Sequence, residues 1–253
     1  VRALPVVVGH DGYRADALYV NLGIGAYSEE SHRKVRHYAD TVAAAHGAKL
    51  IVHVVEQEAG AGIRELATVL HRPTCSTCGT IKRYQFNRAA VEQDYDVMAT
   101  GHNLDDEAAR LLGNVLHWQE EYLDKQSPTL PASVEGFAKK VKPLCRLSER
   151  EIAAYAVVNR IDYIVEECPM AKGSKMILYK EVLNRLETES PGTKQRFYWG
   201  FLEKQTKPEP ATESMAEKDQ RTLHPCTTCG QPTTAEICTY CKMMAKAKTA
   251  TPR

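Results

Sequence analysis

The chain has 253 residues, of which 43% are hydrophobic and 26% are charged, and this composition is ordinary for a soluble globular protein. Its formal net charge of +1 gives no sign of nucleic-acid binding, so any such function must rest on local patches of charge. No stretch approaches the roughly 20 apolar residues of a membrane span and no signal-peptide pattern opens the chain, so we expect no membrane association.

Alternating strands and helices are predicted along the first half of the chain. Buried strands are expected at 15–23, 49–56 and 95–101, and helices at 29–46, 63–70, 81–93 and 103–116. Because apolar strands alternate with helices, the predicted fold class is α/β, with a parallel sheet covered on both faces.

The second half continues with helices and then changes in composition. Helices are expected at 147–158, where Ser148 and Glu151 form a capping box, and at 174–189 and 191–204. A polar, charged and proline-bearing segment follows, which is typical of a linker. We therefore divide the chain into an α/β domain at 1–204, a linker at 205–222, and a separate cysteine module with a basic tail at 223–253.

The cysteine module carries the strongest single signal in the sequence. Its segment CTTCGQPTTAEICTYC has the spacing C-x2-C-x8-C-x2-C, formed by Cys226, Cys229, Cys238 and Cys241. Four thiolates at this spacing predict a structural zinc site, which can fold a segment too short to bury its own core. Four unrelated surface thiols, or a ligand role for His224, are the alternatives. The basic tail is either a solvated terminus or an arm that contacts phosphates.

A further pair, Cys75 and Cys78 in PTCSTCGTIKRY, lies far from the other pairs along the chain. A zinc site needs four ligands and a redox disulfide needs two, while a third option uses three thiolates and leaves one coordination position open. The spacing of the eight cysteines fits metal or redox chemistry in a reducing compartment, so we expect a cytoplasmic protein.

The segment ATGHNLDDEA joins a predicted strand to a predicted helix. The strand ends at Gly101, and Asp105 and Asp106 fall in the first turn of the helix. Ligands of parallel α/β sheets bind at the carboxyl ends of strands, where helix N-termini favour anions. The two acids either cap the helix or hold Mg²⁺ on the phosphates of a nucleotide.

Four segments together resemble a known family. TCSTCGTIKRY, ATGHNLDDEA, EECPMAKGSK and CTTCGQPTTAEICTYC are similar, in order and in spacing, to the TtuA-type tRNA 2-thiouridine synthetases, which include the Ctu and NcsA proteins. These ATP-dependent sulfurtransferases belong to the N-type ATP pyrophosphatase superfamily. The resemblance implies that 1–204 is a catalytic domain with the adenine-nucleotide alpha-hydrolase-like (Rossmann-like) fold, followed by a C-terminal zinc ribbon.

The resemblance also assigns the isolated cysteine pair. The family's cluster ligands match Cys75, Cys78 and Cys168, so it implies a [4Fe–4S] cluster with one iron free of protein ligands and able to bind sulfide. A helix close behind Cys78 would favour the thiolates. A disulfide between Cys75 and Cys78, with Cys168 as a buried core thiol, is the competing interpretation. Cys145 matches no motif and is expected to be structural.

Other site residues follow from the resemblance one at a time. Lys82 and Asp106 match the family's catalytic lysine and aspartate. Gly101 and Val20 match positions whose backbone contacts ATP, with the Val20 side chain expected in the core. The resemblance thus implies that Val20, Lys82, Gly101 and Asp106 bind ATP with Mg²⁺. His102 is expected to orient neighbouring groups, and Asp105 is expected to cap the helix that follows.

Two family features are absent from this sequence. The pyrophosphate loop S-G-G-x-D-S and an N-terminal zinc finger are missing, and VRALPVVVGHDGYRAD resembles the helix that should follow the loop. The strand before that loop is normally central, so its loss would split the sheet and leave unpaired backbone on two neighbours. We therefore expect residues preceding Val1 in the natural protein.

The resemblance implies an enzyme that thiolates tRNA. ATP would adenylate O2 of a uridine, and sulfide would then displace AMP to give 2-thiouridine. The T-loop ribothymidine is favoured over the wobble uridine as the target. The sulfur donor would be a ubiquitin-like carrier with a C-terminal thiocarboxylate, and the enzyme a homodimer. The alternatives are a zinc-ribbon tRNA-binding protein with an inactive domain, and another ATP pyrophosphatase such as an amidating or lysidine-forming ligase.

Overall fold

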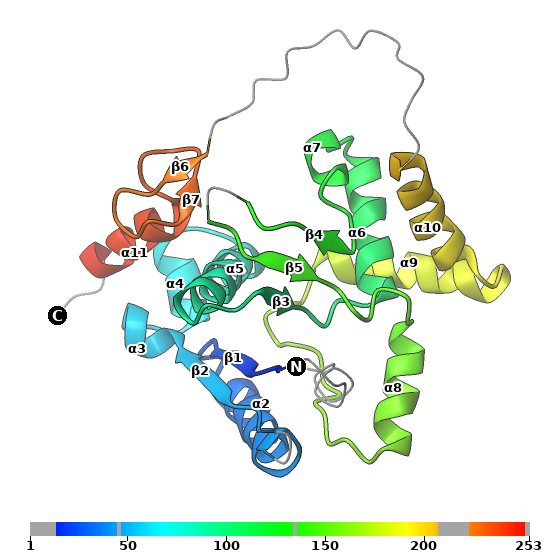
Figure 1. Cartoon of the computed structure of the whole chain (residues 1–253), viewed down its shortest axis with the longest axis horizontal. Coiled ribbons are helices and arrows are strands. Elements are labelled where there is room, and N and C mark those ends of the chain that lie inside the picture. The colour runs from blue at the N-terminus through cyan, green and yellow to red at the C-terminus, as the bar shows by residue number, and fades with distance from the viewer. Residues whose placement is uncertain (1–13, 45–46, 134–135, 207–222, 251–253) are drawn as a thin grey trace, which may run out of the picture.

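Two separate small sheets hold the strands of the α/β part (Figure 1). The structure is a computed structural model that describes residues 14–44, 47–133, 136–206 and 223–250. In one sheet, β1 (Ala17–Asn21) is parallel to β2 (Leu50–Val54). In the other, β5 (Lys139–Val141) is parallel to β3 (Val97–Ala99) and antiparallel to β4 (Thr129–Leu130).

The predicted α/β class is confirmed, with two differences in the sheet. The predicted strands pair in parallel, β1 with β2 and β3 with β5, but β5 itself and the antiparallel β4 were not predicted. Within the described residues, no strand of one of these two sheets is hydrogen-bonded to a strand of the other. The segment that resembles a helix at the start of the sequence lies almost wholly outside the described residues.

Helices surround both sheets. They are α2 (Gly25–Tyr38), continued by a π-helical turn at Ala39–Ala43, α3 (Val55–Ala59), α4 (Ile63–Val69), α5 (Thr74–Glu92), α6 (Leu104–Leu116), α7 (Glu120–Leu123), α8 (Glu149–Val158), α9 (Lys175–Glu189) and α10 (Thr193–Thr206). The C-terminal module consists of β6 (His224–Pro225), β7 (Pro232–Thr233) and α11 (Thr239–Ala250). None of the described helices combines the length and apolar character that crossing a bilayer requires.

Helix α5 begins earlier than the sequence predicted. The expected start was residue 81, but the helix starts at Thr74, directly after Pro73. Its buried positions Thr77, Ile81 and Gln85 are spaced by four residues, so burial of one face extends the helix back past Gly79, although an interior glycine costs about 1 kcal/mol. As a result, both cysteines of the isolated pair lie within α5 rather than before it.

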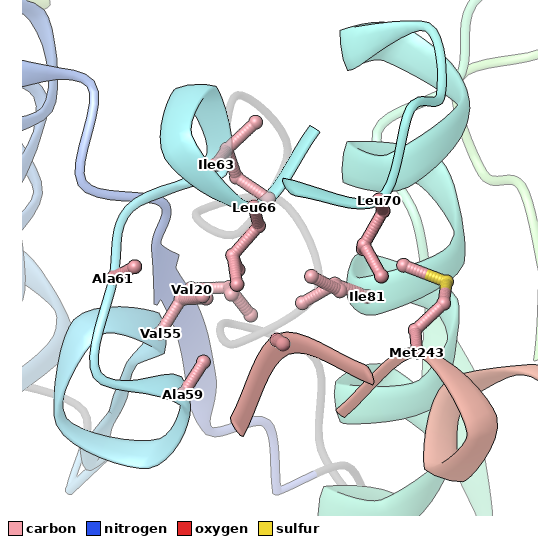
Figure 2. Packing of buried hydrophobic residues seen from close by; sticks show 10 residues of the cluster. Val20, Val55, Ala59, Ala61, Ile63, Leu66, Leu70, Ile81 and Met243 are labelled. Carbon is pink, nitrogen blue, oxygen red and sulfur yellow. The ribbon is translucent and has the colours of Figure 1, made fainter. Parts of the chain in front are cut away.

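The C-terminal module shares a hydrophobic core with the α/β part. Figure 2 shows Val20, Leu66, Ile81 and Met243 packed together, from β1, α4, α5 and α11. Ala247 of α11 is also buried in this cluster, and α11 contacts α3, α4 and α5. Described residues of the basic tail therefore form a packed helix, so the prediction of a solvated terminus is wrong for this part. The first two residues of the predicted linker, 205 and 206, belong to α10. The rest of the linker, 207–222, lies outside the described residues.

Truncating Met243 is expected to weaken this shared core. Met243 is 4% exposed, so Met243→Ala should lower the free energy of unfolding by about 2–5 kcal/mol, because it removes buried methylenes and leaves a cavity. Lys246→Ala on the exposed side of the same helix is the control and should change stability by less than about 0.5 kcal/mol. Urea unfolding curves of both variants measure the difference, and equal midpoints would contradict the packing.

A second core lies between α6, α10 and the segment after β5. Leu111, Cys145 and Tyr198 are buried together, which agrees with the expected structural role of Cys145. Glu107 is 0% exposed, and its carboxylate accepts hydrogen bonds from Lys142 at 2.6 Å and from the Tyr198 hydroxyl at 3.3 Å. The paired charges hold α6 against the end of β5, because an unpaired buried charge is costly.

Candidate metal and nucleotide site

Four cysteines of the C-terminal module converge as predicted. Their sulfurs all lie within 4.8 Å of one another, and the set is Cys226, Cys229, Cys238 and Cys241. The Cys229 and Cys238 sulfurs are 3.7 Å apart. Zn–S bonds of about 2.3 Å in a tetrahedron place sulfurs about 3.8 Å apart, so the spacing fits one zinc ion. In the described part of the chain, His224 belongs to no such group, and this disfavours it as a ligand.

Local backbone geometry builds the first half of this site. The β6–β7 hairpin turns at Gly230, whose φ of +72° suits glycine, and the Gly230 N–H donates to the Cys226 carbonyl at 2.9 Å. Burial opposes ionisation of Cys226, but N–H groups of Cys238, Thr228 and Cys229 point at its sulfur and lower its pKa to about 6. Thiolate, the form that binds metal, is thus favoured at this position.

The module also contacts α5 through aromatic side chains. The rings of Tyr84 and Tyr240 are stacked with centroids 3.6 Å apart. Tyr84 hydrogen-bonds Cys229 of the four-cysteine group, and the Tyr240 hydroxyl lies 3.5 Å from Glu58. Glu58 in turn accepts from Gln85 of α5 at 2.7 Å. These contacts fix the cysteine module to the middle of α5.

Serine at Cys238 is expected to remove the metal from this module. A hydroxyl is a poor zinc ligand and Cys238 is buried, so Cys238→Ser should reduce bound zinc from about one per chain to near zero and expose the module to protease. His224→Ala is the matched control and should keep its zinc. Metal analysis after gel filtration, with limited proteolysis, distinguishes the two outcomes, and loss of zinc in the histidine variant would reassign the ligand.

A second group of cysteines comes together around the start of α5. The Cys75 thiol contacts the Met170 carbonyl at 3.6 Å, which brings the loop between α8 and α9 beside the helix. Burial raises the pKa of Cys78, and the neighbouring charges of Cys168 and Cys75 raise it further. The structure therefore places Cys168 near Cys75 and Cys78, and their shared role as cluster ligands stays a prediction. In the described residues these sulfurs do not form a group within 4.8 Å, so they are spaced more widely than the ligands of one metal ion.

A tight turn presents Cys168. The Ala171 N–H donates to the Cys168 carbonyl at 2.8 Å, and the Ser174 N–H donates to the Ala171 carbonyl at 2.9 Å. Gly173, with φ +78°, takes the left-handed conformation that leads into α9. No cysteine is in a disulfide in the structure, so the alternative of a Cys75–Cys78 disulfide finds no support there.

Lys82 lies one helical turn after Cys78 on α5. This i, i+4 spacing places the two side chains on one face, and Lys82 hydrogen-bonds Cys78. The Lys82 side chain is half-buried at this position. It can therefore favour the thiolate of Cys78 or contact an anionic ligand beside it.

Asp106 caps α6 and forms an ion pair. Its carboxylate accepts from the Asn103 N–H at 3.1 Å while Asn103 accepts from the Asp106 N–H at 2.9 Å, which completes a capping box. The other carboxylate oxygen lies 2.7 Å from the Lys180 ammonium group of α9. Burial lowers the pKa of Lys180, but Asp106 and Glu149 outweigh it and raise that pKa. Nothing near Asp106 in the sequence pointed to Lys180, because the contact is long-range.

Asp105 differs from its expected role. It is 3% exposed and does not cap its own helix: it accepts from the Glu149 N–H of α8 at 2.8 Å and pairs with Lys194 of α10. It therefore joins three helices, and the expectation of a local cap is wrong. His102 Nδ1 is hydrogen-bonded to Thr100 Oγ1 at 2.8 Å. Burial lowers the pKa of His102 to about 4, although the negative charge of Asp106 acts in the opposite direction. The imidazole is therefore neutral near pH 7.

The remaining predicted residues lie at strand ends. Gly101 is exposed in the loop between β3 and α6, at the carboxyl end of β3. Val20 lies in β1, and its side chain is buried in the core of Figure 2, as expected for a residue whose backbone alone would contact a ligand. In the described residues, no hydrogen bond or ion pair joins Lys82 to Gly101 or Asp106. The cysteine group and the Asp106 loop are thus not directly bonded, and that they form one nucleotide site stays a prediction.

Comparison with known proteins places the chain among tRNA-modifying enzymes. It is 45% identical over 241 residues to the tRNA-5-methyluridine(54) 2-sulfurtransferase of Thermus thermophilus, which covers 95% of this chain and 72% of that protein. The proteins of the same name from Pyrococcus horikoshii and Thermotoga maritima are 44% and 40% identical, over 94% and 95% of this chain and 72% and 77% of theirs. No family model matches the chain.

A solved structure shares the fold. The U34-tRNA thiolase NcsA from Methanococcus maripaludis, described with its [4Fe-4S] cluster, superposes with a TM-score of 0.70 at 24% identity, over 90% of this chain and 68% of that one. Fold and site together define a cysteine-rich α/β protein with a four-cysteine C-terminal module. By sequence, the chain belongs to the family of tRNA-5-methyluridine(54) 2-sulfurtransferases.

Proposed function

We propose that this protein is a tRNA 2-sulfurtransferase that converts 5-methyluridine 54 of the T-loop to its 2-thio form, the reaction for which its relatives are named. The observation that carries the proposal is the convergence of Cys75, Cys78 and Cys168 beside Lys82, in a chain of this family. The target at position 54 is favoured over the wobble position because the relatives with the larger coverage carry that name.

Cys75, Cys78 and Cys168 would hold a [4Fe–4S] cluster. Three soft thiolates suit iron–sulfur ligation. When bound through three cysteines, such a cluster supplies one iron without a protein ligand, to which sulfide can bind. The hydrogen bond from Lys82 favours the thiolate form of Cys78.

Asp106, Gly101, Lys82 and Val20 would bind ATP with Mg²⁺. The exposed backbone of Gly101 at the end of β3 can approach the nucleotide closely, and the Asp106 carboxylate in the first turn of α6 can hold the magnesium ion on the phosphates. O2 of the uridine would attack the α-phosphorus and release pyrophosphate. Lys82 would then stabilise negative charge while sulfide attacks C2 and AMP leaves.

The four cysteines of the C-terminal module would hold a structural zinc ion, and the module would contribute to tRNA binding. Sulfur would arrive from a ubiquitin-like carrier protein bearing a C-terminal thiocarboxylate. The enzyme would act as a cytoplasmic homodimer.

Anaerobic reconstitution tests the proposal. The protein purified without oxygen should bind about four irons per chain and, with ATP and sulfide, should add one sulfur to a T-loop RNA containing 5-methyluridine, as measured by mass spectrometry of the nucleosides. Tight RNA binding without a cluster or product would favour the alternative of an inactive binding protein. ATP-dependent modification without bound iron would favour another pyrophosphatase-type ligase.

A further inference from the structure

Three cationic side chains from different elements lie close enough to one another for their charges to interact. Arg83 comes from α5, Arg110 from α6 and Lys140 from β5. Arg83 follows Lys82 directly, and Arg110 lies one turn beyond Asp106 on the same helix. None of the three was singled out by the sequence motifs, because their positions become related only when the chain folds.

The ion pair between Lys142 and Glu107 shows to which face of β5 the Lys140 side chain points. Side chains two residues apart on a strand point to the same face, so Lys140 points to the face from which Lys142 reaches Glu107 of α6 at 2.6 Å. Arg110 is three residues after Glu107 and lies on the neighbouring turn of that helix. Lys140 is half-buried, whereas Lys139 beside it is exposed, as this orientation requires.

The three cations repel one another without an anion between them. Burial lowers the pKa of Lys140, and the charges of Lys142, Arg83 and Arg110 lower it further. Burial and Arg110 likewise lower the pKa of Arg83. In the described part of the chain, no carboxylate oxygen lies within 4.0 Å of a nitrogen of Arg83, Arg110 or Lys140, and the nearby Glu107 already pairs with Lys142.

The cluster also lies beside both halves of the candidate site. Arg83 interacts electrostatically with Cys78 on the same helix, while His102 of the nucleotide loop interacts with Arg110, Lys140 and Asp106. A ligand held by the cluster would therefore be next to the cysteine group on one side and to Asp106 on the other.

We propose that Arg83, Arg110 and Lys140 bind a backbone phosphate of the substrate RNA next to the nucleotide that is thiolated; this rests on the proposed function. A group of cations without carboxylate partners, in which Lys140 is half-buried while Arg83 and Arg110 are exposed to solvent, can bind an anion, and the planar guanidinium of arginine pairs with phosphate oxygens through two hydrogen bonds. The net charge of +1 offers no general attraction for RNA, so a tRNA enzyme of this composition needs local cationic clusters of this kind.

Removing single charges from the cluster tests the proposal. The variants Arg83→Gln, Arg110→Gln and Lys140→Gln should each weaken binding of a T-loop RNA hairpin, measured without ATP, by about 3- to 10-fold near physiological salt. Each should also make the dependence of log K on log salt shallower by about 1, the signature of a lost phosphate contact. Arg185→Gln and Lys204→Gln, at exposed sites on α9 and α10, are matched controls and should leave both quantities unchanged.

Three outcomes would overturn the proposal. One is an unchanged RNA affinity and salt slope in all three variants, with circular dichroism and zinc content like those of the parent protein. Another is weaker binding of ATP or pyrophosphate with RNA affinity unchanged, which would assign the cluster to the nucleotide's phosphates. A third is equal weakening in the control variants, which would indicate general charge effects. Thiolation by the parent protein tests the proposed function separately, so the two failures are distinguishable.

Discussion

Replacing Cys168 by serine is expected to abolish cluster binding and thiolation together. The thiol lies beside Cys75 and Cys78, and a hydroxyl is a poor, hard ligand for iron–sulfur chemistry. With two thiolates left, the cluster should not persist, so the iron content should fall from about four per chain to near zero, and thiolation should fall below detection.

Cys145→Ser is the matched control for this experiment. Cys145 is also a thiol, 6% exposed, but it packs among Leu104, Leu111 and Tyr198 far from any other ligand set. That variant should keep iron and activity and lose only some stability. Iron analysis, absorption near 400 nm and the thiolation assay, all without oxygen, read out both variants. A full cluster and full activity in Cys168→Ser would reduce Cys168 to a simple core thiol.

Asp106→Ala is expected to reduce the rate of thiolation by at least about 100-fold, because the carboxylate would no longer hold magnesium on the phosphates of ATP. Its affinity for RNA should remain nearly unchanged, since the proposed role lies in chemistry rather than in docking. Single-turnover kinetics and RNA binding, measured on the same preparations, separate the two effects.

Because Asp106 also stabilises the fold, a control variant must separate loss of stability from loss of catalysis. The alanine variant also loses a helix cap, at a cost of about 1 kcal/mol, and the partner of Lys180. Asn103→Ala removes the other half of the same capping box but keeps the carboxylate, so it should lose similar stability and retain thiolation. If both variants lose activity equally, the capping role suffices to explain Asp106 and its catalytic assignment is wrong.

Features set by neighbours along the chain could be predicted, and those set by distant contacts could not. The capping box of Ser148 and Glu151 was predicted because four consecutive residues determine it, and the structure contains it. The convergence of the four C-terminal cysteines was predicted because their spacing alone defines a knuckle pair. The start of α5 was predicted seven residues too late, because its first turns depend on burial of Thr77.

Groups of residues that come from several helices and strands could not be predicted from local sequence patterns. Nothing in the spacing of Cys168 ties it to Cys75, and only the resemblance to a family implied that they converge. Lys180 and Lys194, which hold Asp106 and Asp105, lie on helices with no motif, so their partners emerge only from the packing of α9 and α10 against α6. The same holds for Met243, whose burial required the docking of α11.

The contact between Tyr84 and Tyr240 joins the two cysteine groups through one continuous helix. Cys75 and Cys78 lie in the first turns of α5, and Tyr84, further along the same helix, stacks on the C-terminal module and hydrogen-bonds Cys229. If the two groups hold zinc and the cluster as proposed, and if zinc orders α5, the two occupancies are thermodynamically linked: zinc would then strengthen binding of the cluster, and the cluster would strengthen zinc binding by the same factor.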